Sequence, residues 1–281
     1  MSIRSLLTNR RWSSRRAIGA FFVLAPTVAA LLAIFSTAPD LRAGACLLAL
    51  ISALSIGAGL SPRQLHISPT IVEESRVLHA KICSPGELRE ANEIAAAHYG
   101  HDSIPNALAE DWRQASPNSF VCLLDQNSQV VASFGILGLS QRFLDFFIDG
   151  RLVEADLTPH DLLPWDETIN QEAVYISGVV VRDAGSARGQ DRARIMMWSM
   201  LMYFRALFDM TKLQRVYALA ATPDGEHILP KLGFQIQTFA DARRDHHNLY
   251  VLPVSNETIS RIDNLLPDYS HLCRIDFPTV H

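Results

Sequence analysis

One continuous stretch, from Ala173 to Met210, contains the signals of a strand, a polar loop and a long helix. It reads AVYISGVVV, then RDAGSARGQDR, then ARIMMWSMLMYFRALFDM. Ala173 to Val181 is an apolar run rich in β-branched residues, which is typical of a buried strand. Asp183 to Arg192 is polar and holds two glycines, which favours a loop. The apolar residues from Ala193 to Met210 recur at helical spacing, which predicts a helix.

The residues upstream predict three strands and two helices. Ser84 is followed by Pro85 and, three residues on, by Glu87, a combination that caps the N-terminus of a helix. A turn at Asp125 to Ser128 joins two of the strands into a β-hairpin. The predicted strands are Arg76–Ile82, Phe120–Leu124 and Gln129–Leu137, and the helices follow Ser84 and span Ala107–Gln114.

The residues downstream complete an α/β pattern. Phe143 to Pro164 is less regular and predicts one or two short helices with an aromatic stripe. The later elements are a strand at Arg215–Ala221, a short helix at Glu226–Leu232 that ends at Gly233, and a hairpin of Phe234–Phe239 and Asn248–Val254. Antiparallel pairing early and strand–helix alternation late predict a mixed sheet with helices on both faces, of the α/β or α+β class.

Two local motifs within this order resemble the GNAT acyltransferase superfamily, over about Val77 to Pro253. The strand Val179 to Val181 leads into a segment, Arg188 to Met197, which is similar to the family's acyl-CoA loop, written R-x-x-G-x-G/A and followed by an apolar pair. Ile228 to Phe234 is similar to the family's short helix that ends in Leu-Gly-Phe. The resemblance implies a GNAT-like fold and an acyl-CoA co-substrate.

The acyl-CoA loop has two possible registers. In the preferred one, which begins at Arg188, Met196 and Met197 take the apolar-pair positions and Asp191 stands where the family has glycine. The other, Arg182 to Ala187, fits the written pattern literally. A helix N-terminus after the loop suits a pyrophosphate because its N–H groups are unpaired. The resemblance assigns acyl-CoA binding to Val179, Val180, Val181, Arg188, Gly189, Gln190, Asp191, Arg192 and Ala193.

The resemblance also implies direct acyl transfer to an amine. A backbone N–H of the strand would polarise the thioester carbonyl, and a base would take the proton of the amine. Glu172, just before the strand, is the candidate base, with Glu167 and Asp166 as substitutes. Leu229 stands where many family members have a tyrosine that protonates the leaving thiolate. The predicted catalytic residues are therefore Glu172, Tyr217 and His227, the last two as alternative acids. A reaction without an acid is the other possibility, since a thiolate is a tolerable leaving group.

The N-terminus predicts a membrane anchor. Five arginines lie within the first sixteen residues, and Ala17–Ala38 and Ala43–Ser61 contain no charged residue. Each segment is about long enough to cross a bilayer as a helix, and the arginines favour a hairpin with both ends in the cytoplasm. A cleaved signal peptide is the alternative. The expected organisation is residues 1–64 as a basic start with two spans, 65–255 as the GNAT-like domain, and 256–281 as a helix and tail.

Charge and cysteines narrow the classes of partner. The chain has 25 basic and 29 acidic side chains, and with the N-terminal arginines set aside the remainder is strongly acidic, which argues against nucleic-acid binding. The four cysteines form no CxxC pair, so we expect neither a disulfide framework nor a zinc site, and a reducing compartment. The adjacent pair His246 and His247 lacks further ligands, so no metal is expected.

Together these features predict an acyltransferase held at the cytosolic face of a membrane, of the bacterial inner-membrane type. It would transfer an acyl group, most simply acetyl, from acyl-CoA to an amine of a small molecule, a lipid precursor or a protein. Acyl carrier protein is an alternative donor. A catalytically reduced membrane adaptor or acyl-CoA-binding protein on the same fold is the second hypothesis, and a secreted or periplasmic protein is the third.

Overall fold

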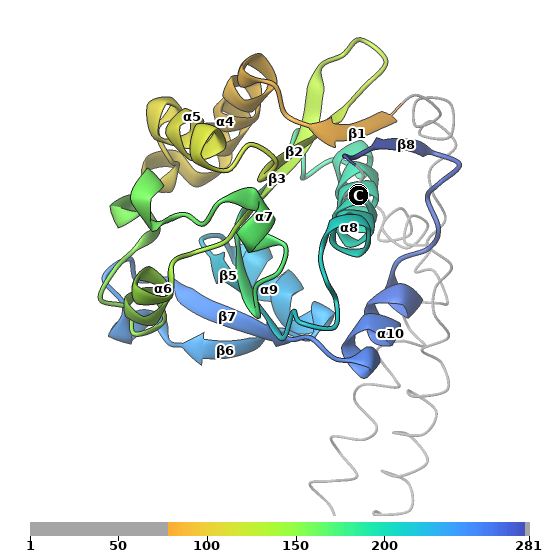
Figure 1. Ribbon diagram of the computed structural model, residues 1–281. Coiled ribbons are helices and arrows are strands. Elements are labelled where there is room, and N and C mark those ends of the chain that lie inside the picture. Colours follow the sequence, from red (N-terminus) through yellow and green to blue (C-terminus); the bar gives the residue numbers. More distant parts are fainter. Residues whose placement is uncertain (1–77, 279–281) are drawn as a thin grey trace, which may run out of the picture. The chain divides into compact units, whose positions relative to one another are not determined.

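The structure is a computed structural model and describes residues 78–278 (Figure 1). Both predicted membrane spans, residues 17–38 and 43–61, lie outside the described residues. Within residues 78–278, no helix combines the length and the apolar character that a bilayer crossing requires.

Eight strands form one mixed sheet, in the order β6-β7-β5-β4-β3-β2-β1-β8. Two neighbouring pairs, β4 with β5 and β1 with β8, are parallel, and the other pairs are antiparallel. The predicted mixed sheet is therefore confirmed. The strands are β1 (Leu78–Ile82), β2 (Phe120–Leu124), β3 (Val130–Leu137), β4 (Ala173–Val181), β5 (Arg215–Ala220), β6 (Gln235–Thr238), β7 (Asn248–Pro253) and β8 (Cys273–Asp276).

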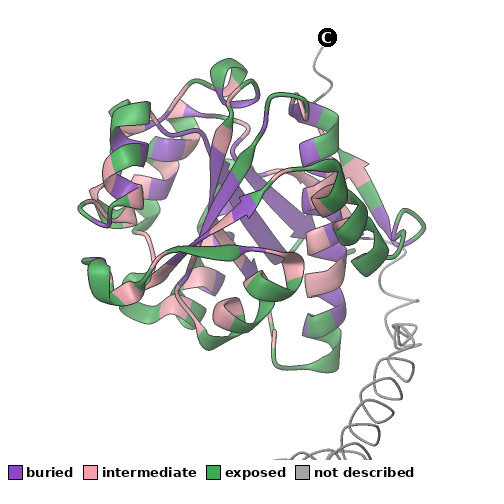
Figure 2. Cartoon of the chain, turned by 90° about the horizontal axis from the view of Figure 1, so that it is seen from below, coloured by how far each residue is buried: buried purple, intermediate pink, exposed green. Residues whose placement is uncertain are grey.

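Helices cover both faces of the sheet, and the strands are buried between them (Figure 2). One core cluster holds residues of the long helix α8 and extends to α9 and α10, and the other holds residues of α4, α5 and α6. The helices are α4 (Pro85–Tyr99), α5 (Asn106–Ala115), α6 (Gln141–Ile148), α7 (Trp165–Thr168), α8 (Ala187–Leu207), α9 (Pro223–Leu232) and α10 (Asn256–Leu265).

The start of α8 corrects the sequence prediction. The helix begins at Ala187, six residues before the predicted start, so most of the predicted loop from Asp183 to Arg192 is helical. Ser186 is the N-cap, and its side chain accepts a hydrogen bond from the Gly189 N–H at 2.9 Å. Asp183 has a positive φ of 57° and turns the chain directly after β4. The loop that remains between β4 and α8 runs from Arg182 to Ser186. The alternative register of the acyl-CoA motif, Arg182 to Ala187, requires a loop as short as this.

A long insertion, residues 138–172, separates the neighbouring strands β3 and β4. It contains α6, a 3-10 turn at Glu154–Asp156 and the short α7. The connection after β6 holds it in place, because the Arg243 guanidinium donates to the Phe147 carbonyl at 2.6 Å. Thr238 likewise donates to the Ile148 carbonyl at 2.6 Å. The first part of the insertion thus packs on the face of the sheet that α4 and α5 cover, whereas Trp165 and Ile169 of its last part pack in the core cluster of α8.

Two further features correct the sequence predictions. Cys83, which follows β1, and Cys122, in the adjacent antiparallel strand β2, form a disulfide with a Cα–Cα distance of 5.3 Å. The expectation of no disulfide was wrong because 39 positions separate the two cysteines and no spacing motif marks them. The predicted C-terminal tail also contains strand β8, which pairs with β1 and extends the sheet.

Candidate functional site

The parallel strands β4 and β5 separate partway along their length. Their pairing covers Ala173–Ile176 against Arg215–Ala218 and then stops. The pairing of β4 with β3 continues to Val181, with a register shift that leaves Ser177 as an extra residue. Such a bulge bends its strand and increases the local twist. The second half of β4 is consequently turned away from β5, and the sheet opens between the two strands.

The opened edge of β4 carries backbone groups that face away from β3. Arg182 N–H donates to the Val131 carbonyl of β3 at 2.8 Å, so the alternate residues Val179 and Val181 point to the other side. Two side chains at the end of α4 reach their carbonyls. The Tyr99 hydroxyl donates to Val179 O, and Nε2 of His98 bonds to Val181 O, both at 2.9 Å. A ligand that uses these two carbonyls has to replace Tyr99 and His98.

Gly178 leaves open space beside the bulge. A Cβ atom built at this position would have no heavy atom within 4 Å apart from its chain neighbours. Its φ is not positive, so the backbone does not itself require glycine. By contrast, a Cβ at Gly135 on the paired strand would collide with the Ser177 hydroxyl. The missing side chain at Gly178 therefore provides room for a ligand on the opened part of β4.

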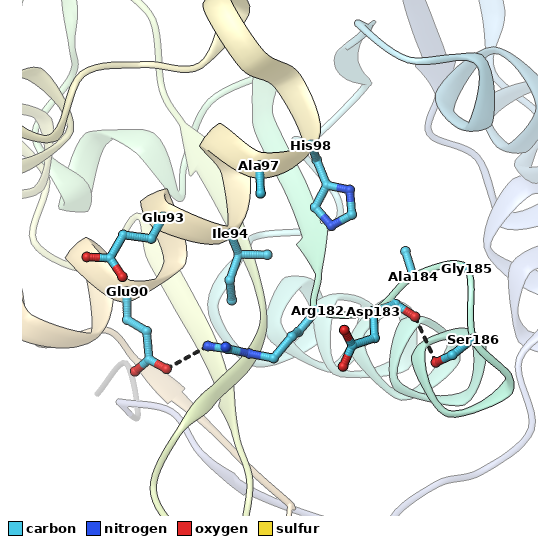
Figure 3. A pocket seen from close by; sticks show the side chains of 10 residues that line it. All are labelled: Glu90, Glu93, Ile94, Ala97, His98, Arg182, Asp183, Ala184, Gly185 and Ser186. Atoms are coloured by element: carbon cyan, nitrogen blue, oxygen red, sulfur yellow. Dashed lines mark hydrogen bonds and ion pairs between the residues drawn. The ribbon is translucent and has the colours of Figure 1, made fainter.

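A pocket of about 620 Å³ lies between the second half of α4 and the loop before α8 (Figure 3). One wall is helical and the other is the loop from Arg182 to Ser186. Close packing explains the glycine in the first turn of α8, because a Cβ at Gly189 would collide with the Asp183 carbonyl. The lining residues are Glu90, Glu93, Ile94, Ala97, His98, Arg182, Asp183, Ala184, Gly185 and Ser186.

Charges of both signs surround this pocket and the start of α8. Arg182 pairs with Glu90 of α4 at 2.7 Å (Figure 3). Arg192 is buried, and its burial and the neighbouring Arg188 lower the pKa of its guanidinium, while Asp183 acts in the opposite direction. Asp191 is also buried, and it forms an ion pair with Arg194. The charge of Asp191, a residue of the preferred register for the predicted acyl-CoA loop, is therefore compensated within the helix.

The structure brings together part of the predicted acyl-CoA set. Val179 and Val181 lie on the opened edge, directly before the pocket and the N-terminus of α8. The backbone of Val180 has the opposite orientation and faces β3, and its side chain is buried like that of Val181. The other predicted residues, Arg188, Gly189, Gln190, Asp191, Arg192 and Ala193, form the first two turns of α8 rather than a loop.

The predicted catalytic residues do not meet in one place. Glu172 is exposed before the first residue of β4, roughly 23 Å along the strand from Val179 at about 3.3 Å per residue. His227 is exposed on α9, with Nε2 at 2.6 Å from the Lys231 ammonium. Tyr217 is buried on β5 and is the register partner of Tyr175, next to the last paired residues of the parallel strands. Of the three, Tyr217 is the one beside the opening.

A carboxyl that the sequence did not single out, that of Glu154, lies on the face of the sheet that α4 and α5 cover. Glu154, in the 3-10 turn of the insertion, has an Oε1 atom that is shielded from solvent and has no hydrogen-bond partner within residues 78–278. Burial raises the pKa of Glu154 to about 8, the Asp245 carboxylate adds to the rise, and a hydrogen bond with Tyr175 opposes it. No motif marks Glu154, because only the fold of the insertion brings it to the sheet.

Two tyrosines and an ion pair surround Glu154. Burial and Glu154 raise the pKa of Tyr175 well above its ordinary value. The pKa of Tyr99 rises to about 12 for the same two reasons. Arg243 is buried and donates two hydrogen bonds to Asp245, at 3.0 and 2.7 Å. Its guanidinium also lies over the Phe147 ring, 4.8 Å from the centroid. The opened edge of β4, the Glu154 carboxyl and the two tyrosines thus form one polar centre at the bulge.

The part of the chain that the structure describes contains no group of three His, Cys, Asp or Glu side chains arranged to hold a metal ion.

Comparison with known proteins gives partial structural likenesses. No family model matches the sequence, and no curated protein matches it. Among solved structures, Ard1 from Thermoplasma volcanium is 17% identical, with a TM-score of 0.43, and covers 64% of this chain and 99% of its own. A GNAT-like decarboxylase, GphF, in complex with isobutyryl-CoA is 12% identical, with a TM-score of 0.44, and covers 63% and 99%. A GNAT phosphinothricin acetyltransferase from Sinorhizobium meliloti, in complex with acetyl-CoA, is 13% identical, with a TM-score of 0.40, and covers 64% and 89%.

Proposed function

We propose that the chain binds acyl-CoA at the opening between β4 and β5 and transfers its acyl group, most simply acetyl, to an amine. The observation that carries the proposal is the bulge at Ser177, after which β4 loses β5 as a partner. This exposes an edge at Val179 and Val181 that leads directly to the N-terminus of α8. A strand edge of this kind pairs with an extended amide-containing chain, and a helix N-terminus binds phosphate.

Each part of the site has a role in this proposal. The N–H groups of Val179 and Val181 pair with the pantetheine amides, and one of them polarises the thioester carbonyl. Arg182 and Arg188, with the first N–H groups of α8, hold the pyrophosphate. The open space at Gly178 receives the thioester end. Tyr217, beside the opening, is the sequence candidate that remains in position to act on the leaving thiolate.

A second candidate function is a non-catalytic acyl-CoA-binding adaptor. Two observations favour it: Leu229 replaces the family's tyrosine, and Tyr99 and His98 occupy the carbonyls of the opened edge. Acyl transfer is preferred because Glu154, a carboxyl with one solvent-shielded and unpartnered oxygen, lies at the same centre. A module that only binds has no need of such a group, since it costs folding free energy.

The place of action is also a proposal. The apolar segments at residues 17–38 and 43–61 support a membrane anchor that keeps the domain near lipid precursors or membrane proteins. The positive-inside rule favours the cytosolic face, where acyl-CoA is supplied. The disulfide between Cys83 and Cys122 points instead to an oxidising compartment, because such bonds are uncommon in the cytosol. A reporter fused after His281 decides between the two faces.

The test is a calorimetric titration of the full-length chain, purified in a mild detergent, with acetyl-CoA. Gly178→Val is the critical variant, since valine fits a strand and its side chain enters space that is empty of protein atoms. Gly86→Ala, in the first turn of α4 and outside the pocket lining, is the matched control, because a Cβ there also meets no atom within 4 Å. We expect the wild type and the control to bind acetyl-CoA with micromolar affinity. Gly178→Val should lose at least about tenfold in affinity, while its melting temperature stays unchanged. Equal binding by all three proteins, or none by folded wild type, contradicts the proposal.

A further inference from the structure

We propose that Glu154 is the general base that accepts the proton of the acceptor amine, and that the β3–β4 insertion places it over the opened edge of β4. This inference rests on the proposed acyl transfer and assigns to that reaction a residue that the sequence motifs do not contain. The juxtaposition that carries it is a carboxyl with an unpartnered, solvent-shielded oxygen beside the bulge where β4 leaves β5.

The position of Glu154 follows from its electrostatic coupling to two tyrosines, one on β4 and one at the end of α4. Glu154 and Tyr175 shift each other's pKa, and Tyr175 lies two residues before the bulge residue Ser177. Glu154 also acts electrostatically on Tyr99, whose hydroxyl is bonded to Val179 O after the bulge. Gly178 lies between Tyr175 and Val179 on β4, and the space beside it is open. Glu154 is therefore held next to the segment where the thioester is proposed to lie.

The surroundings give Glu154 no cationic partner among the described residues. The groups that face it are Tyr99 from α4, Tyr175 from β4, and Arg243 and Asp245 from the connection between β6 and β7. The nearby cation, Arg243, already binds Asp245 through two hydrogen bonds and the Phe147 carbonyl through a third. A buried carboxylate without a cation is costly. An ammonium group of a substrate would supply the missing partner.

The chemistry balances with Glu154 as the proton acceptor. The ionised Glu154 takes one proton from the acceptor ammonium, which leaves a neutral amine. The nitrogen lone pair attacks the thioester carbonyl carbon, the new N–C bond forms, and the C–S bond breaks with its electron pair on sulfur. The nitrogen loses its second proton and the thiolate takes up one, so an amide and a free thiol result. No oxidant, reductant or metal is needed.

The raised pKa of Glu154, about 8 in the folded chain, suits this role. A base works best when its pKa is close to the operating pH. A bound ammonium would lower the pKa towards neutrality, because an opposite charge favours the ionised form. The purely structural alternative is that Glu154 only orients Tyr175.

The test compares the full-length wild type with Glu154→Gln, Glu154→Asp and Asp156→Asn. Asp156 is a matched control because it lies in the same 3-10 turn and pairs with Arg244, and an asparagine there keeps an oxygen that can accept the Val153 N–H. Calorimetry measures the binding of acetyl-CoA. Release of the CoA thiol, measured from pH 6 to pH 9 (roughly one to two units on each side of the pKa), reports transfer to tyramine, octylamine or spermidine as probe amines, or to water.

We expect Glu154→Gln to bind acetyl-CoA like the wild type but to lose at least about a hundredfold in kcat/KM. The increase in rate with pH near the pKa of Glu154 should also be absent in this variant. Glu154→Asp should recover part of the rate with a displaced pH profile, and it keeps the test valid if the glutamine variant does not fold. Asp156→Asn should behave like the wild type. A wild-type rate and pH profile in Glu154→Gln overturns the assignment.

The two proposals fail in different ways. Wild-type protein that binds acetyl-CoA but releases no thiol with any probe overturns the role of Glu154 and supports the adaptor function. Wild-type protein that is folded and does not bind acetyl-CoA overturns the proposed function, and the role of Glu154 with it.

Discussion

At the scale of single residues, we expect Glu154 to contribute to the pH dependence of stability. Its pKa rises from an ordinary 4.5 to about 8 in the folded chain. The folded state therefore binds the proton more tightly than the unfolded state between these pH values. The stabilising effect of the proton is fully present below pH 4.5 and is lost as the pH rises through about 8.

We predict that the free energy of unfolding of the wild type contains a term that falls by up to about 1.4 kcal/mol per pH unit across this window. Glu154→Gln removes the term because glutamine does not titrate. Urea unfolding at pH 5, 6, 7 and 8, followed by circular dichroism, checks this (pH values chosen across roughly the window set by the two pKa values). Parallel pH curves for the two proteins would show that Glu154 has an ordinary pKa.

The sequence indicated some of the site residues and missed others for physical reasons. Two of the sequence candidates lie at the opening or at the start of α8: Gly189, which a motif indicated, and Tyr217, a polar residue on the strand after the predicted acyl-CoA loop. Glu172 was chosen for its place beside β4, but a strand is long, and the residue lies at the end away from the opening. Glu154 and Tyr99 reach the site through an insertion and through the end of a distant helix. No local pattern encodes such contacts.

At the scale of helices and strands, the end of α4 competes for the opened edge of β4. The Tyr99 hydroxyl satisfies the Val179 carbonyl. A pantetheine amide that bonds to the same carbonyl must displace it. Tyr99→Phe removes the competing donor while it keeps the ring. We predict that it tightens acetyl-CoA binding about two- to tenfold, the equivalent of one ordinary hydrogen bond.

Calorimetric titration of Tyr99→Phe with acetyl-CoA checks this prediction, and Tyr269→Phe is its control. Tyr269 is buried beside α8 in the other core cluster, and its hydroxyl has no hydrogen-bond partner within residues 78–278. Weaker binding by Tyr99→Phe than by the control would mean that Tyr99 supports the ligand instead of competing with it.

The two long helix N-termini show what a local pattern can predict. Ser84, with proline next to it and Glu87 three residues on, gives a capping box, and the structure confirms the start of α4 there. At α8, the Ser186 side chain accepts a hydrogen bond from the Gly189 N–H. Glycine has no side chain that could accept from the Ser186 N–H, so the sequence shows no capping box there. Glycine also disfavours helix on intrinsic propensity. The start of α8 was therefore predicted too late.

At the scale of the whole molecule, the disulfide is expected to stabilise the described domain. Cys83 and Cys122 are buried and close a loop with a sequence separation of 39. Loop closure of this length corresponds to about 2–4 kcal/mol of stability. We predict that a reductant lowers the melting temperature of the wild type. The double variant Cys83→Ser/Cys122→Ser should melt at a lower temperature that a reductant does not change.

Thiol counting on the denatured, unreduced protein provides the independent control for that prediction. The variant should show the same number of free thiols as the wild type, since the removed cysteines are paired. Two fewer thiols in the variant would show that the cysteines are reduced in the isolated protein.

The sheet as a whole was predictable in class but not in extent. Alternation of apolar segments predicted a mixed sheet with helices on both faces, and the structure confirms it. Strand β8 was missed because its four residues, Cys273–Asp276, carry little pattern of their own. It pairs in parallel with β1, nearly the whole domain away in sequence. Such pairings depend on the assembled fold.

Amide hydrogen exchange of the full-length chain, with and without acetyl-CoA, locates the bound ligand on the fold. We expect acetyl-CoA to slow exchange at Val179, Val181 and the first turn of α8, where the opened strand edge and the helix N-terminus meet. Exchange on β8, at the far edge of the sheet, should not change. Protection confined to other parts of the chain, or no protection at saturating acetyl-CoA, would contradict acyl-CoA binding at the opening between β4 and β5.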